Sequence, residues 1–329
     1  MFRIAAFLVI ILLVSGPGRA RAEEGNVTPL TSRKDKVRVA AVQMKIQDEF
    51  LKDHDTVDAL IPHIERAGRE GQDLIVFPEY LLGNFKIESP LVRKLCEQAK
   101  KNNVNVIAAG WEFLPDAPIQ HPPLPRTYAN TALIIGRDGK LIGTYRKIHE
   151  AVGAHSPFCW PPDKGEMGEW TMLAGREHPV FDMDFGRIGV LTCYDGYFFS
   201  SFEIPSLKGA EILVWINSRM GMVEPHIIQA ASFMTCTHIV ATNFEGGGGT
   251  GFCKHPGWQT EQVREPGFAY VTTELDLAGL RVQRRNYRMF HQRKPELYGD
   301  LVKRWKPWEA YPDIPMQEPY DPEKDTGKK

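Results

Sequence analysis

Three segments of the sequence each place a reactive side chain just after a run of apolar residues. Glu79 follows the run LIVF in DLIVFPEYLLG, Lys147 follows KLIGTYR, and Cys193 ends the run in FGRIGVLTC. Short apolar runs of this kind are typical of buried strands in α/β proteins. Functional sites collect at the ends of such strands, so we expect a carboxylate, an ammonium group and a thiol to gather there.

Together these three groups could cleave an amide. The thiol is a nucleophile, but its ordinary pKa of about 8.5 leaves most of it protonated at neutral pH. We expect Lys147 to favour the thiolate of Cys193. A carboxylate such as Glu79 can take the thiol proton and deliver it to the leaving amine. Each residue taken singly is more simply explained as core or solvated surface, whereas three of them after three strands favour a catalytic site.

The segments between these residues alternate between strand and helix patterns. We expect helices near 57–64, from Ser89-Pro90 onward, at 198–208 and at 225–237, and a hairpin across 127–146. Buried strands are predicted at 37–44, 74–77, 104–110, 187–193, 212–216 and 238–242. This alternation predicts an α/β protein whose sheets are buried on both faces.

The three segments, in this order, resemble the signature blocks of the nitrilase superfamily, the carbon–nitrogen hydrolases. VRVAAVQM near the start, IVATN, and RKPELY near the end also fit. The resemblance covers residues 36–298 and implies a four-layer α-β-β-α sandwich. It also implies hydrolysis of a non-peptide C–N bond through a cysteine thioester, with Glu79, Lys147 and Cys193 as the triad and with no cofactor.

The resemblance implies further site residues. Lys147 and the backbone N–H of Tyr194 would hold the oxyanion that develops on the substrate. The family also uses a second glutamate in the loop before the nucleophile strand, for which both Glu166 and Glu169 are candidates. Glu169, six positions before Gly175, fits the family spacing better.

Asp195 bears on the class of substrate. In similar proteins, amidases and carbamoyl hydrolases more often carry Cys-x-Asp, as here, whereas true nitrilases usually carry Cys-Trp-Glu. We expect Asp195 to anchor the turn and so to set where the Tyr194 N–H meets a substrate oxyanion. The sequence therefore favours a small amide or N-carbamoyl substrate without identifying it. The alternatives are a nitrile substrate, or a catalytically inactive binding protein on the same fold.

The first 22 residues have the pattern of an export signal. Arg3 precedes an apolar run of 11 residues, which is followed by Gly16-Pro17-Gly18 and then by Ala20-Arg21-Ala22. The run is too short to span a bilayer, which takes roughly 20 residues. We expect cleavage before Glu23 and a periplasmic or secreted protein; the alternative is an uncleaved segment that anchors the chain to a membrane.

The length and composition allow one large core or at most two modest domains. The chain has 329 residues, 43% of them hydrophobic, and a net charge of −1, which gives no basic field for nucleic acid. Residues 23–35 resemble a linker, and 299–329 form a proline-rich tail. We expect no regular structure beyond Tyr287, and a tail that covers a surface. Similar proteins commonly dimerise through helices near the nucleophile and exchange their tails, so a homodimer or a larger homo-oligomer is expected.

The remaining cysteines and histidines point to no second site. The five cysteines leave at least one thiol unpaired in an exported protein. Cys159, Cys236 and Cys253 could supply one disulfide, but the sequence does not choose the pair. Cys253-x-His255 has no second ligand pair at suitable spacing, so we expect no metal. His149 and His155 flank the Lys147 loop and could contact substrate, but solvated loop histidines are the simpler expectation. Residues 246–251 match a dinucleotide pattern, but no helix pattern follows them, so no nucleotide cofactor is expected.

Overall fold

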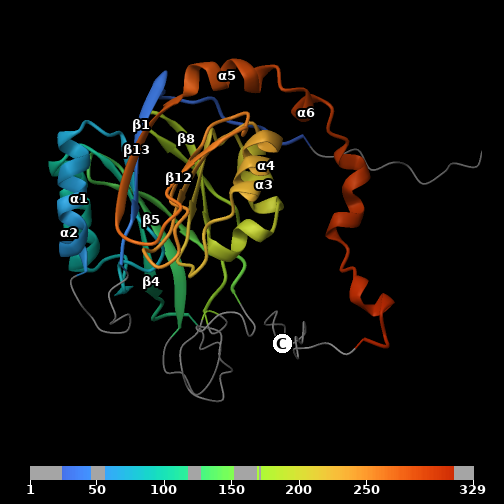
Figure 1. Cartoon of the computed structure of the whole chain (residues 1–329), viewed down its shortest axis with the longest axis horizontal. Coiled ribbons are helices and arrows are strands. Elements are labelled where there is room, and N and C mark those ends of the chain that lie inside the picture. Colours follow the sequence, from blue (N-terminus) through green and yellow to red (C-terminus); the bar gives the residue numbers. More distant parts are fainter. Residues whose placement is uncertain (1–23, 46–55, 118–126, 152–168, 170–171, 315–329) are drawn as a thin grey trace, which may run out of the picture.

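Two β-sheets packed face to face form the body of the protein, and helices cover their outer faces (Figure 1). The computed structural model describes residues 24–45, 56–117, 127–151, 169 and 172–314. The predicted signal segment, Glu166, Cys159, His155 and residues 315–329 of the tail lie outside the described residues.

The first sheet has seven strands in the order β13-β1-β2-β4-β5-β6, with β3 beside β4. Its strands β1, β2 and β4 are parallel, and β13, β5 and β6 run antiparallel to their neighbours. Their bounds are β1 Lys36–Gln43, β2 Leu74–Val76, β3 Asn84–Phe85, β4 Asn105–Phe113, β5 Tyr128–Ile135, β6 Leu141–Arg146 and β13 Ala269–Asp276.

The second sheet has six strands in the order β12-β11-β10-β9-β8-β7. Strands β8, β9 and β10 are parallel, and the flanking strands β7 and β11 are antiparallel to them. Their bounds are β7 Val180–Met183, β8 Gly186–Thr192, β9 Ile212–Ile216, β10 His238–Thr242, β11 Gly251–Cys253 and β12 Thr260–Gln262.

Successive residues of the buried strands contribute to different cores. In β2, Val76 packs in the cluster between the sheets, whereas Ile75 packs against the outer helices α1 (Val57–Arg69) and α2 (Pro90–Lys101). In β8, Val190 faces the central cluster and Leu191 faces the outer one. Because side chains alternate along a strand, continuous apolar runs fill layers on both faces.

The second pair of helices completes the sandwich. Helices α3 (Ser200–Leu207) and α4 (Pro225–Thr235) place Phe202 and Ile228 in the outer cluster of the second sheet. The two pairs of helices lie on opposite sides of the two sheets (Figure 1). The predicted four-layer α-β-β-α architecture is therefore confirmed.

Several predicted elements lie where the sequence indicated. The predicted strands at 212–216 and 238–242 match β9 and β10 residue for residue, and the hairpin is formed by β5 and β6. At the start of α2, the Ser89 hydroxyl accepts a hydrogen bond from the Val92 N–H at 3.4 Å, and Pro90 occupies the first turn. A side-chain cap followed by proline is the pattern on which that helix was predicted.

The segment after Tyr287 is partly regular, so the prediction of no regular structure there was wrong. It contains α6 (Arg288–His291), η4 (Pro295–Val302) and η5 (Pro307–Ala310), after α5 (Leu277–Arg285). Both η4 and η5 begin with proline. Proline lacks a backbone N–H, and the N–H groups of the first helical turn have no partner within the helix, so the substitution costs no hydrogen bond there. Residues 297–314 are exposed and extend away from the sandwich (Figure 1), so this segment covers no surface of its own chain.

None of the helices within the described ranges is both long and apolar enough to cross a membrane.

Candidate active site

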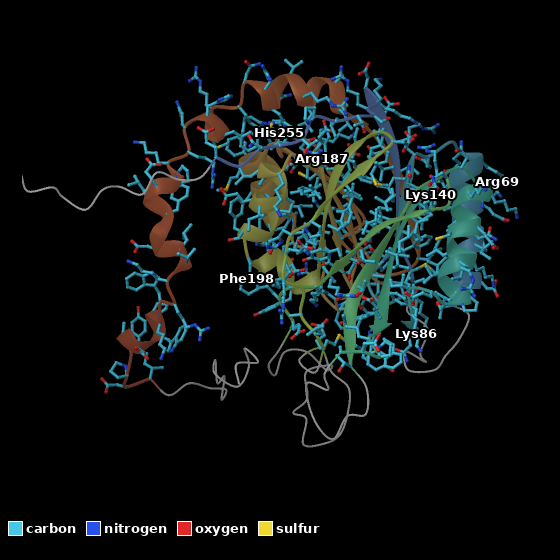
Figure 2. All side chains as sticks on the ribbon, turned by 180° about the vertical axis from the view of Figure 1, so that it is seen from behind. Arg69, Lys86, Lys140, Arg187, Phe198 and His255 are labelled. Atoms are coloured by element: carbon cyan, nitrogen blue, oxygen red, sulfur yellow. The ribbon has the colours of Figure 1, made fainter. Side chains whose placement is uncertain are left out.

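The three predicted catalytic residues all follow strands that end at the same end of the sandwich. Strand β8 begins beside Arg187 and leads to Cys193, and Figure 2 shows Arg187 toward one end of the molecule and Phe198 toward the other. Glu79 follows β2, and its backbone N–H donates to the carbonyl of Asn217 after β9 at 3.3 Å. This bond joins the carboxyl end of a strand in one sheet to the corresponding end in the other.

Cys193 occupies a strained position in a tight turn. It is the first residue of the 3₁₀ helix η3 (Cys193–Tyr197), and its φ of +45° lies in the left-handed region. The indole N–H of Trp215 donates to the Cys193 carbonyl at 2.9 Å. A Cβ at Gly196 would lie 2.1 Å from the Trp215 ring, so the turn needs glycine there. Strain of this kind in a non-glycine residue is enriched at functional sites.

The carboxylate of Asp195 anchors this turn. It is fully buried and accepts hydrogen bonds from the Thr192 N–H at 3.0 Å and from the Tyr145 hydroxyl at 2.6 Å. Its other oxygen accepts from the backbone N–H of His149 and lies 2.9 Å from the His149 ring nitrogen Nδ1. Burial alone would raise the pKa of Asp195, but the bonds from His149 and Tyr145 hold it below its usual value. Because both oxygens are engaged within the protein, Asp195 acts on the site by positioning the turn.

His149 is a structural partner of this turn, so the prediction of a solvated loop histidine was wrong. Its ring stacks on Phe198 with 3.8 Å between the ring centroids, besides its contacts with Asp195. Since His149 follows Lys147 by two residues, these contacts tie the Lys147 segment to the nucleophile turn.

Lys147, Glu79 and Glu169 form one buried, mutually bonded cluster. The Lys147 ammonium donates to the two carboxylate oxygens of Glu169 at 2.6 and 2.8 Å and to Glu79 Oε1 at 3.3 Å. The Asn130 amide donates to the same Glu79 oxygen at 2.7 Å, and the Tyr80 hydroxyl donates to Glu169. Lys147 and Glu79 each expose only 1% of their surface. Such a cluster holds an ammonium ion and a carboxylate in fixed positions away from bulk water.

The electrostatics of the cluster keep Lys147 charged. Burial alone would lower the pKa of Lys147, but the carboxylates of Glu169 and Glu79 raise it well above its ordinary value. Burial raises the pKa of Glu79 to about 6, with Lys147 opposing and Glu169 adding to the shift. Near neutral pH the site therefore holds a lysine cation beside a carboxylate that is close to its titration range.

Burial favours the protonated form of the Cys193 thiol, while Lys147 acts on it in the expected direction, toward the thiolate. Burial and the Glu79 carboxylate raise the pKa of Cys193 to about 12, although Lys147 and Arg219 act to lower it. The positive charge of Lys147 is largely offset by two carboxylates, so its effect on the thiol is smaller than the cost of burying a thiolate. The Glu79 carboxylate, a group that could accept a proton, is among the charges that act on this thiol.

Sequence reasoning missed three residues that hold the candidate site together: Asn130, Tyr80 and Tyr145. Asn130 carried a usable signal, because it is an amide side chain inside the mostly apolar, fully buried strand YANTALII. A buried polar side chain in such a strand needs a partner, and here the partner is Glu79. Tyr80 and Tyr145 carried no distinguishing signal in the sequence.

The four cysteines within the described part of the chain form no disulfide. Cys96, Cys193, Cys236 and Cys253 are free thiols, and Cys236 Sγ lies 3.5 Å from the His255 ring. Within the described part of the chain, no group of three or more histidine, cysteine or acidic side chains could hold a metal ion.

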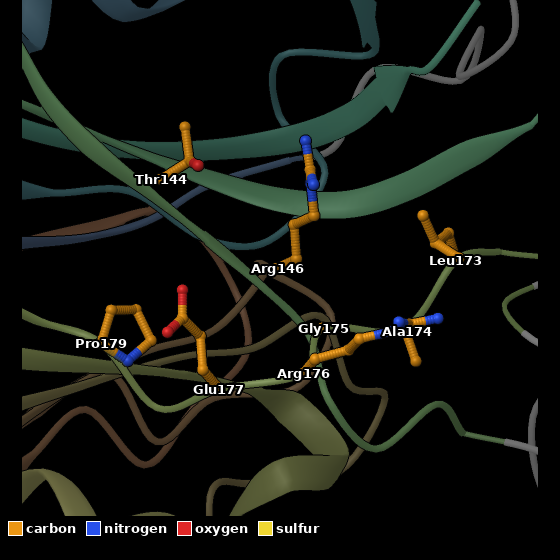
Figure 3. Close-up of a pocket in the computed structure, with 8 residues that line it drawn as sticks. All are labelled: Thr144, Arg146, Leu173, Ala174, Gly175, Arg176, Glu177 and Pro179. Carbon is orange, nitrogen blue, oxygen red and sulfur yellow. The ribbon is translucent and has the colours of Figure 1, made fainter. Parts of the chain in front are cut away.

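A separate pocket of about 370 Å³ lies beside the Lys147 segment (Figure 3). It is lined by Thr144, Arg146, Leu173, Ala174, Gly175, Arg176, Glu177 and Pro179. Arg146 in this pocket is already paired with Glu112 at 2.8 Å. None of the predicted catalytic residues lines the pocket, so it gives no support to the predicted chemistry.

Comparison with known proteins identifies the family. The carbon–nitrogen hydrolase family matches residues 38–266 of this chain, so the chain belongs to that family and is a hydrolase. It is 24% identical over 309 residues to the citrullinase of Francisella tularensis, covering 82% of this chain and 99% of that protein. It is 23% identical over 291 residues to the omega-amidase NIT2 of Homo sapiens, covering 81% and 98%.

The fold is also that of solved relatives. The C. elegans NitFhit protein matches with a TM-score of 0.65 and 21% identity over 81% of this chain and 67% of that chain. The family and the fold class expected from the sequence are therefore both confirmed.

Proposed function

We propose that this protein hydrolyses a small amide or N-carbamoyl compound through a thioester on Cys193. The single observation that carries the proposal is the buried Lys147–Glu79–Glu169 cluster, whose charges act on the thiol of Cys193. The names of the similar proteins, a citrullinase and an omega-amidase, agree with substrates of this class.

In the first half of the reaction, Glu79 takes the thiol proton as the sulfur attacks the carbonyl carbon. The carbonyl oxygen becomes an oxyanion, which Lys147 and the Tyr194 N–H would stabilise. As this intermediate collapses, the C–N bond breaks and the proton on Glu79 moves to the leaving nitrogen. Ammonia or an amine departs and a thioester remains on Cys193.

In the second half, Glu79 takes a proton from water as the water oxygen attacks the thioester carbonyl. The C–S bond breaks, the proton returns to sulfur, and a carboxylic acid is released. An N-carbamoyl substrate gives a carbamic acid, which breaks down to carbon dioxide and an amine. Because burial favours the protonated thiol, Glu79 would take the proton of Cys193 as the C–S bond forms.

Glu169 would position Lys147 in this scheme. Its carboxylate holds the ammonium through two hydrogen bonds and also accepts from the backbone N–H of Ala151 at 2.6 Å. Glu166, the other candidate from the sequence, lies outside the described residues.

Substrate class is tested by comparing matched compounds. Release of ammonia from an amide, the N-carbamoyl compound and the nitrile with the same side group gives three values of kcat/KM. We expect the amide or the N-carbamoyl compound to exceed the nitrile by at least about tenfold, because Asp195 fixes the turn that presents the Tyr194 N–H to an oxyanion. A tenfold preference for the nitrile would instead support a true nitrilase.

We also propose that the protein is exported. The support is the sequence pattern of residues 1–22, which ends in Ala20-Arg21-Ala22. N-terminal sequencing of the protein from its native host should begin at Glu23, and an intact Met1 on cytoplasmic protein would refute the proposal.

A further inference from the structure

Glu150 is held at the edge of the candidate site by its two neighbours in the chain. The backbone N–H of His149 donates to Asp195 at 2.9 Å, and the backbone N–H of Ala151 donates to Glu169 at 2.6 Å. The residue between them is therefore fixed between the carboxylate that anchors the nucleophile turn and the carboxylate that binds Lys147.

One oxygen of the Glu150 carboxyl group is buried without a partner. Its Oε1 atom is inaccessible to solvent and has no hydrogen-bond partner within the described part of the chain. The other carboxylates of the candidate site, Glu79, Glu169 and Asp195, each accept at least two hydrogen bonds. Buried polar groups are rarely left unpaired in native proteins, and an exception calls for an explanation such as a ligand.

The charges around Glu150 favour a cationic partner. Burial, together with the carboxylates of Glu169 and Asp195, raises the pKa of Glu150 to about 9, and only Lys147 opposes the shift. The Lys147 ammonium is already bonded to Glu79 and Glu169, and the ring of His149 is turned to Asp195. The raised pKa favours the neutral acid form of Glu150 beside the carboxylates of Glu169 and Asp195.

We infer that Glu150 is a specificity determinant of the proposed amide hydrolase, and that it binds a protonated amine carried by the substrate. This inference rests on the proposed function. A substrate ammonium would donate to the unpaired oxygen, and its charge would let Glu150 release its proton and form a charge-assisted pair. An anionic substituent would meet Glu150, Glu169 and Asp195 together and would be disfavoured.

Three amides of similar length test the inference. δ-Aminovaleramide carries an ammonium where hexanamide carries a methyl group, and glutaramate carries a carboxylate. We expect kcat/KM for δ-aminovaleramide at pH 7 to exceed that for hexanamide by roughly 10- to 100-fold, the worth of one hydrogen bond between charged groups. Glutaramate should be the poorest substrate of the three.

Two variants show whether Glu150 causes the preference for the amine-bearing amide. Glu150→Gln keeps the shape of the side chain but cannot ionise, and it should reduce the ratio of δ-aminovaleramide to hexanamide by about tenfold or more. The matched control Glu177→Gln makes the same substitution at an exposed loop position, and it should leave that ratio unchanged. The melting temperature of each variant reports whether it has folded.

A binding measurement covers the case in which Glu150→Gln folds poorly. The Cys193→Ala variant, which should not turn substrate over, is titrated with δ-aminovaleramide and with hexanamide, and the amine should bind at least about tenfold more tightly. Equal kcat/KM for the two amides in the wild-type enzyme, or an unchanged ratio in Glu150→Gln, would overturn the inference while leaving the hydrolase intact. If no amide or N-carbamoyl compound is hydrolysed at all, the proposed function fails and this inference fails with it.

Discussion

The ammonium nitrogen of Lys147 lies 2.6 and 2.8 Å from the two carboxylate oxygens of Glu169, and both side chains are buried. Glu169 holds the Lys147 ammonium that would stabilise the oxyanion. The negative charge of Glu169 also raises the pKa of Glu79, the proposed base.

Replacing Glu169 by glutamine should therefore reduce kcat and change the pH profile. The amide keeps the shape but loses the charge that holds Lys147, so we expect kcat to fall roughly 10- to 100-fold, the worth of one hydrogen bond to a charged group. The acid limb of kcat/KM should move to lower pH, because Glu79 no longer faces a second carboxylate. A wild-type rate and an unmoved acid limb would show that Glu169 has no part in the site.

The acid limb itself should report Glu79. The base must be unprotonated to accept the thiol proton, and its pKa is raised to about 6, so kcat/KM should rise with pH through about 6 and then level off. The Asn130 amide favours the charged form of Glu79, so Asn130→Ala should move this limb to higher pH. A shift toward lower pH in Asn130→Ala would contradict the assignment of Glu79 as the base.

Asp195→Asn should loosen the nucleophile turn. The carboxylate accepts from Thr192, Tyr145 and His149, and an amide nitrogen cannot accept from the groups that face it. We expect a loss of about 1–3 kcal/mol in the free energy of unfolding and a fall in kcat. Tyr145→Phe removes one of these donors and should have a smaller effect on both quantities. Equal effects of the two substitutions on urea unfolding and on kcat would argue against Asp195 as the anchor.

The exposed tail predicts association. Leu301, Val302 and Trp305 are 80%, 89% and 63% exposed, which is unusual for apolar side chains that lie close together in the sequence. We expect sedimentation to show a dimer or a larger oligomer, and the double substitution Leu301→Asp, Val302→Asp to weaken it. Lys303→Ala, in the same segment, is the control that should not. A monomer for the wild-type protein at micromolar concentration would contradict this prediction.

The sequence predicted the parts of the site that depend on strand ends. Glu79 and Cys193 each follow a buried strand, whereas Lys147 follows the partly exposed edge strand β6. The regular alternation of strand and helix determines where those ends lie. The pairing of Asp195 with Tyr145 and His149 could not be predicted, because it depends on how two separate sheets pack. The balance of charges on the Cys193 thiol could not be predicted for the same reason. The pKa of its thiol reflects burial and the summed charges of Lys147, Glu79 and Glu169, which are known only from the assembled site.

The central claim is that Cys193 forms a covalent acyl intermediate, and the mass of the enzyme during turnover tests it most directly. Acid quenching with an amide that the enzyme hydrolyses should trap protein that is heavier by one acyl group, carried on the peptide that contains Cys193. The Cys193→Ala variant should show neither the adduct nor measurable hydrolysis, while keeping its melting temperature. An adduct on a different residue, or turnover that persists in Cys193→Ala, would contradict the account.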